Sequence, residues 1–185
     1  GVDLRNQLQQ VRFGLAPVTG LKKLSSAHSD AYRANFNLPA DAFVVTVGYN
    51  ASAGHRHLMV IEELAAVKEQ LPQNTTLLLP CTYPKDTAYT DEIKAKLEAS
   101  GFSFLILTEF MSNEAVAELR MASDVMIQVQ PTDQFSGSMT EALIAENLVI
   151  TGSWLPYDDF DRMGAYLRRV DDPADVGRCL AAQVF

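Results

Sequence analysis

The chain has 185 residues, of which 48% are hydrophobic and 21% are charged, and it carries a formal net charge of -8. This composition excludes a disordered, collagen-like or coiled-coil protein, and a chain of this length can bury a core of its own. The acidic balance argues against nucleic acid as a partner, because binding to its backbone needs a basic face. No apolar run reaches the roughly 18 residues that would indicate a membrane span.

The first 40 residues mix polar residues with glycines and prolines and show no sustained hydrophobic period. We therefore predict that residues 1–40 are a linker or interdomain segment, with a short helix near Asp30 to Asn35, and that residues 41–185 form the domain. The chain begins with Gly1 rather than Met, as a piece of a longer protein would.

From residue 43 the pattern becomes regular. Short runs of β-branched and leucine residues predict strands, which span residues 43–48, 76–79, 104–107, 125–129 and 148–151, with a further strand at 166–170. Apolar residues at helical spacing predict helices at 55–71, 88–100, 113–122, 137–145 and 173–184. Because continuous apolar strands alternate with helices, we predict an α/β fold with a Rossmann-like, doubly wound parallel sheet.

Ligands of such sheets bind outside the carboxyl ends of the strands. The loop from Gly48 to His57 leaves the first strand and enters a helix, whose N-terminus favours a phosphate. Arg56 would add a bidentate phosphate donor. The loop fits neither the GxGxxG nor the P-loop pattern. The alternative is an ordinary turn in which His55 and His57 are solvated at a helix start.

The loop after the fourth strand carries two carboxylates, Asp133 and Glu141, eight residues apart. Between them, Ser136-Gly137-Ser138 lets backbone N–H groups approach an anion closely. N–H groups for a diphosphate and carboxylates for sugar hydroxyls together match a nucleotide sugar. The alternative is that Ser138 and Glu141 form a capping box at the helix start and that Asp133 only forms a turn.

Cys81 and Cys179 are far apart and form no CxxC motif, so we expect reduced thiols in a cytoplasmic, reducing compartment. The histidines His28, His55 and His57 have too few cysteines nearby for a zinc site. We expect neither a metal nor a cofactor.

These residues together resemble a known family. Asp133, Phe135 and Glu141 have the order of two acids with an aromatic residue between them, and the segments 119–125 and 141–150 align with the family's flanking motifs. Residues 43 to about 184 resemble the C-terminal, donor-binding domain of GT-B fold glycosyltransferases, especially family 4. The segments 48–57 and 83–89 are also similar to acetamido-fucosyl transferases.

The resemblance implies catalytic roles for Asp133, which would contact the transferred hexose, and for Arg56, which would stabilise the departing diphosphate. It implies that Glu141 binds the ribose and that Phe110 binds the base. The diphosphate would be bound by the N–H groups of Gly137, Ser138 and Met139, together with Ser136 and Gly48. His55 or His57 could supply the positive charge in place of Arg56. The alternative role of Phe110 is core packing, which is also the role that we expect for Trp154 and Tyr157.

The resemblance further implies transfer of a sugar from a nucleoside diphosphate sugar to a polysaccharide or lipid-linked acceptor, without an essential metal. The N-terminal acceptor domain would be missing from this chain, which alone would be inactive. Membrane association, at the inner face, would come only through that absent half. Tyr49 stands where the family commonly has Arg, and no Lys follows in the loop. The alternatives are therefore a degenerate, non-catalytic scaffold domain and an epimerase of GT-B fold.

Overall fold

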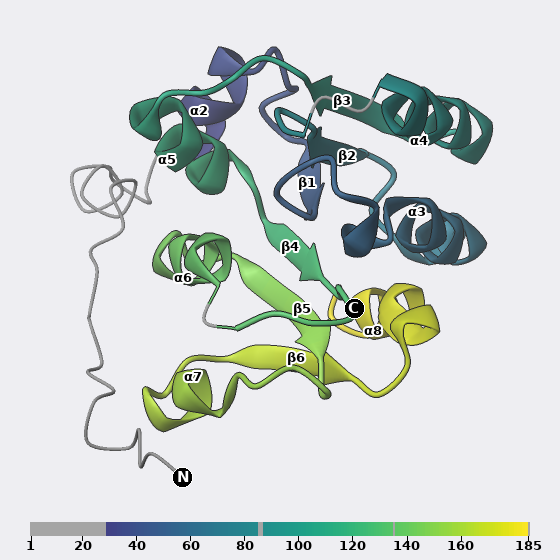
Figure 1. Cartoon of the computed structure of the whole chain (residues 1–185). Coiled ribbons are helices and arrows are strands. Elements are labelled where there is room, and N and C mark those ends of the chain that lie inside the picture. The colour runs from purple at the N-terminus through teal and green to yellow at the C-terminus, as the bar shows by residue number, and fades with distance from the viewer. Residues whose placement is uncertain (1–28, 85–86, 135, 185) are drawn as a thin grey trace, which may run out of the picture.

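Six parallel strands form one sheet in the order β3-β2-β1-β4-β5-β6 (Figure 1). The strands are β1 (Phe43–Val47), β2 (Thr75–Pro80), β3 (Ser103–Leu107), β4 (Val125–Gln128), β5 (Leu148–Gly152) and β6 (Leu167–Val170). This computed structural model describes residues 29–84, 87–134 and 136–184. The predicted Rossmann-like parallel sheet is confirmed, and its order reverses direction between β1 and β4.

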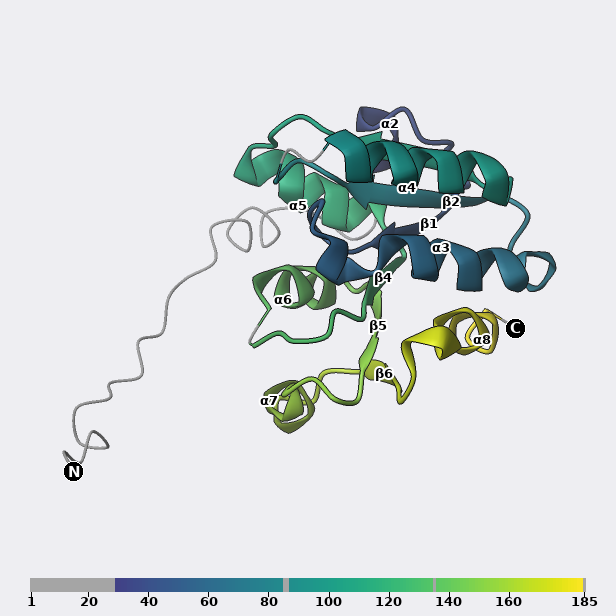
Figure 2. The same cartoon turned by 45° about the vertical axis from the view of Figure 1, so that its right-hand side comes forward.

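Helices cover both faces of the sheet (Figures 1 and 2). They are α2 (Ser29–Asn35), α3 (His57–Ala66), α4 (Thr87–Ser100), α5 (Asn113–Ala122), α6 (Gly137–Ile144), α7 (Asp158–Arg162) and α8 (Val176–Ala181), with short 3-10 turns at Ala53–His55, Lys68–Gln70 and Pro173–Asp175. One face carries α4, α3 and α8 side by side, and the other carries α2, α5 and α6.

The alternation of side chains along each strand supplies the two cores. In β1, Val45 packs into the cluster with α3, α4 and α8, whereas Val44 packs with Leu119 of α5 on the opposite face. In β4, Ile127 joins the first cluster and Met126 joins the one beneath α6 and α7. Successive side chains of a strand point to opposite faces, so two-sided burial explains why these strands are continuous apolar runs.

Three helical segments differ from the sequence prediction. The helix predicted at 55–71 begins with a 3-10 turn, because Arg56 adopts a left-handed conformation with φ of 58° between the turn and α3. Helix α3 ends at Ala66 and is followed by the 3-10 turn at Lys68–Gln70. The helix predicted at 173–184 divides into a 3-10 turn and α8. Helix α7 was not predicted, since five residues with three aspartates in the first turn show no helical period.

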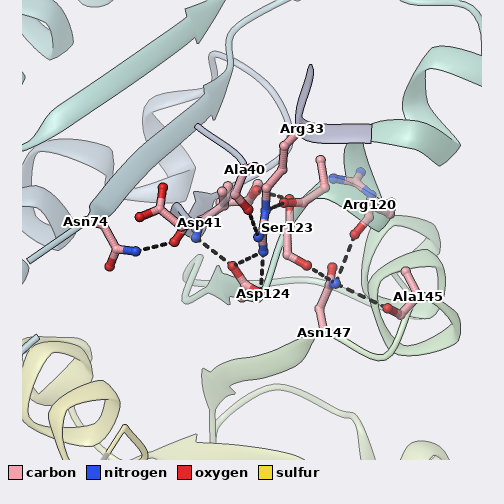
Figure 3. Close-up of polar contacts among 12 residues, drawn as sticks. Arg33, Ala40, Asp41, Asn74, Arg120, Ser123, Asp124, Ala145 and Asn147 are labelled. Atoms are coloured by element: carbon pink, nitrogen blue, oxygen red, sulfur yellow. Dashed lines mark hydrogen bonds and ion pairs between the residues drawn. The ribbon is translucent and has the colours of Figure 1, made fainter. Parts of the chain in front are cut away.

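The predicted short helix near Asp30 to Asn35 is present as α2, and it lies along α5. Arg33 donates two hydrogen bonds from Nη2 to the carboxylate of Asp124, at 2.8 and 2.9 Å, and one from Nη1 to the carbonyl of Ala40 (Figure 3). Asp124 also accepts from the backbone N–H of Val44 at 2.7 Å. These contacts fasten α2 to the start of β1 and β4. The first 28 residues of the predicted linker lie outside the described residues.

Within the described ranges, no helix is both long and apolar enough to cross a membrane.

Candidate functional site

The loops that follow β1, β4 and β5 meet at the carboxyl edge of the sheet. Tyr49, after β1, receives a hydrogen bond from Nε2 of Gln130, after β4, at 3.5 Å. Trp154, after β5, donates from its indole nitrogen to the carbonyl of Gln130 at 3.0 Å. The three loops flank the point where the strand order reverses, which is where ligands of this architecture bind.

Gly48 follows β1 directly and has a left-handed conformation with φ of 65°. A Cβ atom at this position would lie 2.8 Å from Cγ of His55 and 3.0 Å from Nε2 of His57. The loop therefore turns over the two imidazole rings at a distance that only glycine permits. This close approach explains a glycine that sequence reasoning treated only as a phosphate-binding feature.

His55 and His57 are buried beneath this loop rather than solvated. Burial lowers the pKa of His55 to about 4, and burial together with the neighbouring His55 lowers the pKa of His57 to about 3. Nδ1 of His57 lies 3.3 Å from the hydroxyl of Tyr89. Both rings are thus neutral near neutral pH, which differs from the expectation that either would supply positive charge to a diphosphate.

Arg56 lies between the two histidines in sequence, but unlike them it is only half-buried. Its guanidinium carbon stands 5.7 Å from the centre of the Trp154 ring. Among the described residues, the guanidinium has no hydrogen-bond or ion-pair partner. Arg56 is therefore the cation of this loop that is available to an anionic ligand.

Asp133 is held by protein donors on both carboxylate oxygens. Nε2 of Gln128 donates to Oδ2 at 3.0 Å, the hydroxyl of Tyr157 donates to the same oxygen, and the backbone N–H of Gln134 donates to Oδ1 at 2.8 Å. Burial, and then the contact with Asp133, raises the pKa of Tyr157. Tyr157 is packed as expected, but its hydroxyl also orients the carboxylate, a role that its sequence position did not reveal.

Ser136, rather than Ser138, caps helix α6: its Oγ accepts from the backbone N–H of Met139 at 3.3 Å. This geometry excludes the capping box that Ser138 and Glu141 would form. It also engages one of the three N–H groups predicted for the diphosphate. The N–H groups of Gly137 and Ser138 have no partner among the described residues, so they remain as donors at the helix N-terminus.

Glu141 points from the second turn of α6 toward α5, where Nε of Arg120 lies 3.3 Å from its Oε2. Burial raises the pKa of Glu141, and the positive charge of Arg120 opposes that rise. The other carboxylate oxygen, Oε1, makes no hydrogen bond with any residue in the described ranges. Sequence reasoning missed Arg120, although a lone arginine within the apolar run from Leu119 to Ala122 indicates a buried partner.

Phe110 follows β3, and β2 lies between that strand and β1 in the sheet. The side chain of Phe110 is 84% exposed. Core packing, its alternative role, is thereby excluded. Tyr83, after the neighbouring strand β2, is also exposed. Tyr83 lies beside the loop that follows β1, because its carbonyl accepts a hydrogen bond from the backbone N–H of Ala51 at 2.7 Å. Phe135 lies outside the described residues. No group of three or more histidine, cysteine or acidic side chains within the described ranges is arranged to hold a metal ion.

The sequence matches no family model, and no curated protein matches it. Its structure is similar to HepE of Anabaena in complex with UDP-glucose, with a TM-score of 0.67 and 16% identity over 86% of this chain and 43% of HepE. It is also similar to the C-terminal domain of LpcC, a glycosyl transferase group 1 family protein of Francisella tularensis, with a TM-score of 0.68 and 13% identity over 85% of this chain and 82% of that domain.

A glycosyltransferase of Rickettsia africae matches 92% of this chain with a TM-score of 0.69 and 13% identity, and the match covers 44% of the Rickettsia chain. The chain thus spans less than half the length of HepE and of the Rickettsia protein. Its fold is that of one half of a GT-B glycosyltransferase, and the matching part of LpcC is a C-terminal domain.

Proposed function

We propose that this chain is the donor-binding domain of a glycosyltransferase and that it binds a nucleoside diphosphate sugar at the carboxyl edge of its sheet. The observation that carries the proposal is Glu141, a buried carboxylate with one oxygen paired to Arg120 and the other without a hydrogen bond to any described residue. A carboxylate oxygen that is fixed in place and free accepts hydrogen bonds from sugar hydroxyls. The ribose is its ligand in this proposal.

Two groups support a diphosphate next to that ribose. The N–H groups of Gly137 and Ser138, which bond to no described residue, lie at the positive end of the α6 dipole. Arg56 presents a guanidinium that pairs with no acid in the described part of the chain, from the loop after β1 across the switch point of the sheet. The likeness to HepE, whose structure holds UDP-glucose, makes UDP the first nucleotide to test.

The transferred sugar would lie near Asp133, whose carboxylate is oriented by Gln128 and Tyr157. Transfer would proceed to a polysaccharide or lipid-linked acceptor, with N–H groups and Arg56 stabilising the departing diphosphate. In this proposal a second, N-terminal half completes the cleft and supplies the acceptor contacts, and the enzyme works in the cytoplasm. The chain alone would then bind donor weakly and transfer nothing.

The test is a titration of the full chain with UDP, dTDP, GDP and ADP, in which binding is monitored by protein-observed NMR. We expect millimolar, base-selective binding whose shifts map to residues 48–57 and 136–141. Glu141→Gln should weaken it about tenfold, because a charged acceptor is lost. The matched control is Glu98→Gln, at an exposed position of α4. Absence of binding at millimolar nucleotide in this chain would contradict the proposal and favour the degenerate scaffold.

A further inference from the structure

Trp154 connects the three loops that form the candidate site. It follows β5, donates from Nε1 to the carbonyl of Gln130 after β4, and lies beneath the guanidinium of Arg56 from the loop after β1. The hydrogen bond fixes the indole at its nitrogen, so the ring plane on which Arg56 stands is set by the loop after β4. The indole therefore has a defined orientation rather than being one more packed aromatic ring.

Gly152, the last residue of β5, makes this orientation possible. A Cβ atom at Gly152 would lie 2.3 Å from the Cε2 and Cζ2 atoms of the indole, so the ring occupies the space of the missing side chain. Its φ angle is not in the left-handed region, and the glycine is therefore explained by the close approach of the ring rather than by backbone conformation. We call the contact between the Arg56 guanidinium and the Trp154 ring the Arg56–Trp154 stack.

Arg56 reaches the stack from an unusual backbone position. Its φ of 58° places it in the left-handed region, where it ends the 3-10 turn and begins α3. Such a conformation costs a non-glycine residue on the order of 1 kcal/mol or more, so surrounding contacts must hold it. No acidic side chain in the described ranges pairs with this guanidinium. The guanidinium instead contacts the indole ring of Trp154.

We propose that Trp154 is a positioning residue for the diphosphate: its ring holds the Arg56 guanidinium by a cation–π contact and leaves the N–H edges free for phosphate oxygens. This inference rests on the proposed function, since Arg56 acts there on the diphosphate. A guanidinium that contacts an aromatic ring keeps its N–H donors available, whereas an ion pair with a carboxylate would occupy them. The stack also restricts the rotamers of Arg56 before the ligand arrives, which reduces the entropy lost on binding.

The first test needs no ligand. Trp154 is the single tryptophan of the chain, so its fluorescence reports the stack directly. Arg56→Met removes the cation and should change the emission intensity and maximum, whereas Arg56→Lys, which keeps a cation, should give a smaller change. Arg162→Met, an exposed arginine on α7, is the control and should leave the emission unchanged. Identical emission spectra for the wild type and Arg56→Met would contradict the contact between Arg56 and Trp154.

The second test measures UDP and uridine affinity by NMR for the full chain. Trp154→Leu should weaken UDP binding about three- to tenfold, the range of a partly desolvated cation–π contact, and should leave uridine binding unchanged. Trp154→Phe should recover most of the UDP affinity, because phenylalanine retains an aromatic face. Gly152→Ala, which displaces the indole without removing it, should match Trp154→Leu. A merely structural role would weaken uridine and UDP alike, and that result would overturn the proposal.

Tyr166→Leu provides a matched control. The guanidinium carbon of Arg168 stands 4.7 Å from the centre of the Tyr166 ring, in an arginine–aromatic contact at the start of β6, away from the carboxyl edge. Removing that ring should leave UDP affinity at the wild-type value. Wild-type binding that Trp154→Leu does not weaken would overturn the positioning role and leave the proposed function intact. If the wild type binds no UDP, the proposed function fails, and the phosphate role of the stack fails with it.

Discussion

Arg120 and Glu141 form an ion pair between neighbouring helices, with Nε of Arg120 3.3 Å from Oε2 of Glu141 and side chains only 5% and 7% exposed. Burial alone would favour the neutral acid, but the arginine charge opposes the rise in the pKa of Glu141. The pair joins α5 to α6, so a contact that supports the fold also prepares the carboxylate proposed to bind ribose. Stability and ligand affinity are therefore coupled at Glu141.

Arg120→Met should lower the free energy of unfolding by about 3 kcal/mol or more, because it leaves a buried carboxylate without its partner. The pKa of Glu141 should rise in the same variant, since only the effect of burial remains. Urea unfolding near neutral pH measures the first effect, and NMR titration of the Glu141 carboxyl carbon measures the second.

The double variant Arg120→Met/Glu141→Gln is the control for that prediction. It removes both charges, so it should unfold at a higher urea concentration than Arg120→Met alone. A double variant that is less stable than the single one would show that the two side chains do not form the coupled pair. Under the proposed function, the UDP affinity of both variants should be lower than that of the wild type.

The stability of the protein should fall as pH is lowered from about 6.5 because of His55 and His57. Their pKa values in the folded state, about 4 and about 3, lie below the usual value of 6.5. The unfolded chain therefore binds protons that the folded chain does not, and the stabilisation present above pH 6.5 is lost as pH falls toward the folded-state values. As the pH falls from about 7 to about 5.5, each histidine should lower the free energy of unfolding by about 1 kcal/mol.

Urea unfolding at intermediate pH values measures this slope, and the window above pH 5 avoids most carboxylate titration. The control is a variant with both histidines replaced by glutamine. It should be nearly independent of pH in this window, even if it is less stable than the wild type at neutral pH. Equal slopes for the two proteins would contradict the buried, neutral state of the rings.

The contact between Arg33 and Asp124 should stabilise the attachment of α2. Arg33→Met removes both hydrogen bonds to the Asp124 carboxylate and the one to Ala40, and it leaves a carboxylate that is one-third exposed. We expect a loss of about 2 kcal/mol, less than for a fully buried pair because water reaches Asp124. Hydrogen exchange of α2 should accelerate at the same time. Arg162→Met, at a fully exposed pair on α7, should leave the unfolding midpoint unchanged. Equal effects of the two variants would contradict the role assigned to Arg33.

The order of strands and helices was predictable from the sequence because burial on both faces leaves a strong local pattern. Val44 and Val45 are adjacent, yet each packs in a different core, so β1 reads as a continuous apolar run. The break of the first long helix was not predictable, because it depends on the left-handed backbone of Arg56. The side chain of this residue contacts Trp154, which is distant in sequence.

The candidate site was also predictable only in part: its local residues could be identified from the sequence, but their distant partners could not. Asp133 and Glu141 were singled out by their spacing, but their partners, Tyr157 and Arg120, are 24 and 21 residues away. Spacing rules describe one loop or one helix, whereas these contacts form between elements. The histidines were misjudged for a related reason, since a polar residue in a loop sequence gives no sign that the loop folds over it.

Gly48→Ala provides the last prediction, because Gly48 combines a positive φ with a close approach to the buried rings. An alanine there must overcome both the left-handed strain and the overlap with His55 and His57. Gly164→Ala is the matched control: its φ is 77°, and nothing lies within 4 Å of the added Cβ. The left-handed strain alone should lower the free energy of unfolding of Gly164→Ala by about 1 kcal/mol, and the loss in Gly48→Ala should be clearly larger. Gly48→Ala should also weaken UDP binding, because the displaced loop carries Arg56. Equal losses of stability in the two variants, measured by urea unfolding, would show that the loop yields to the extra methyl group.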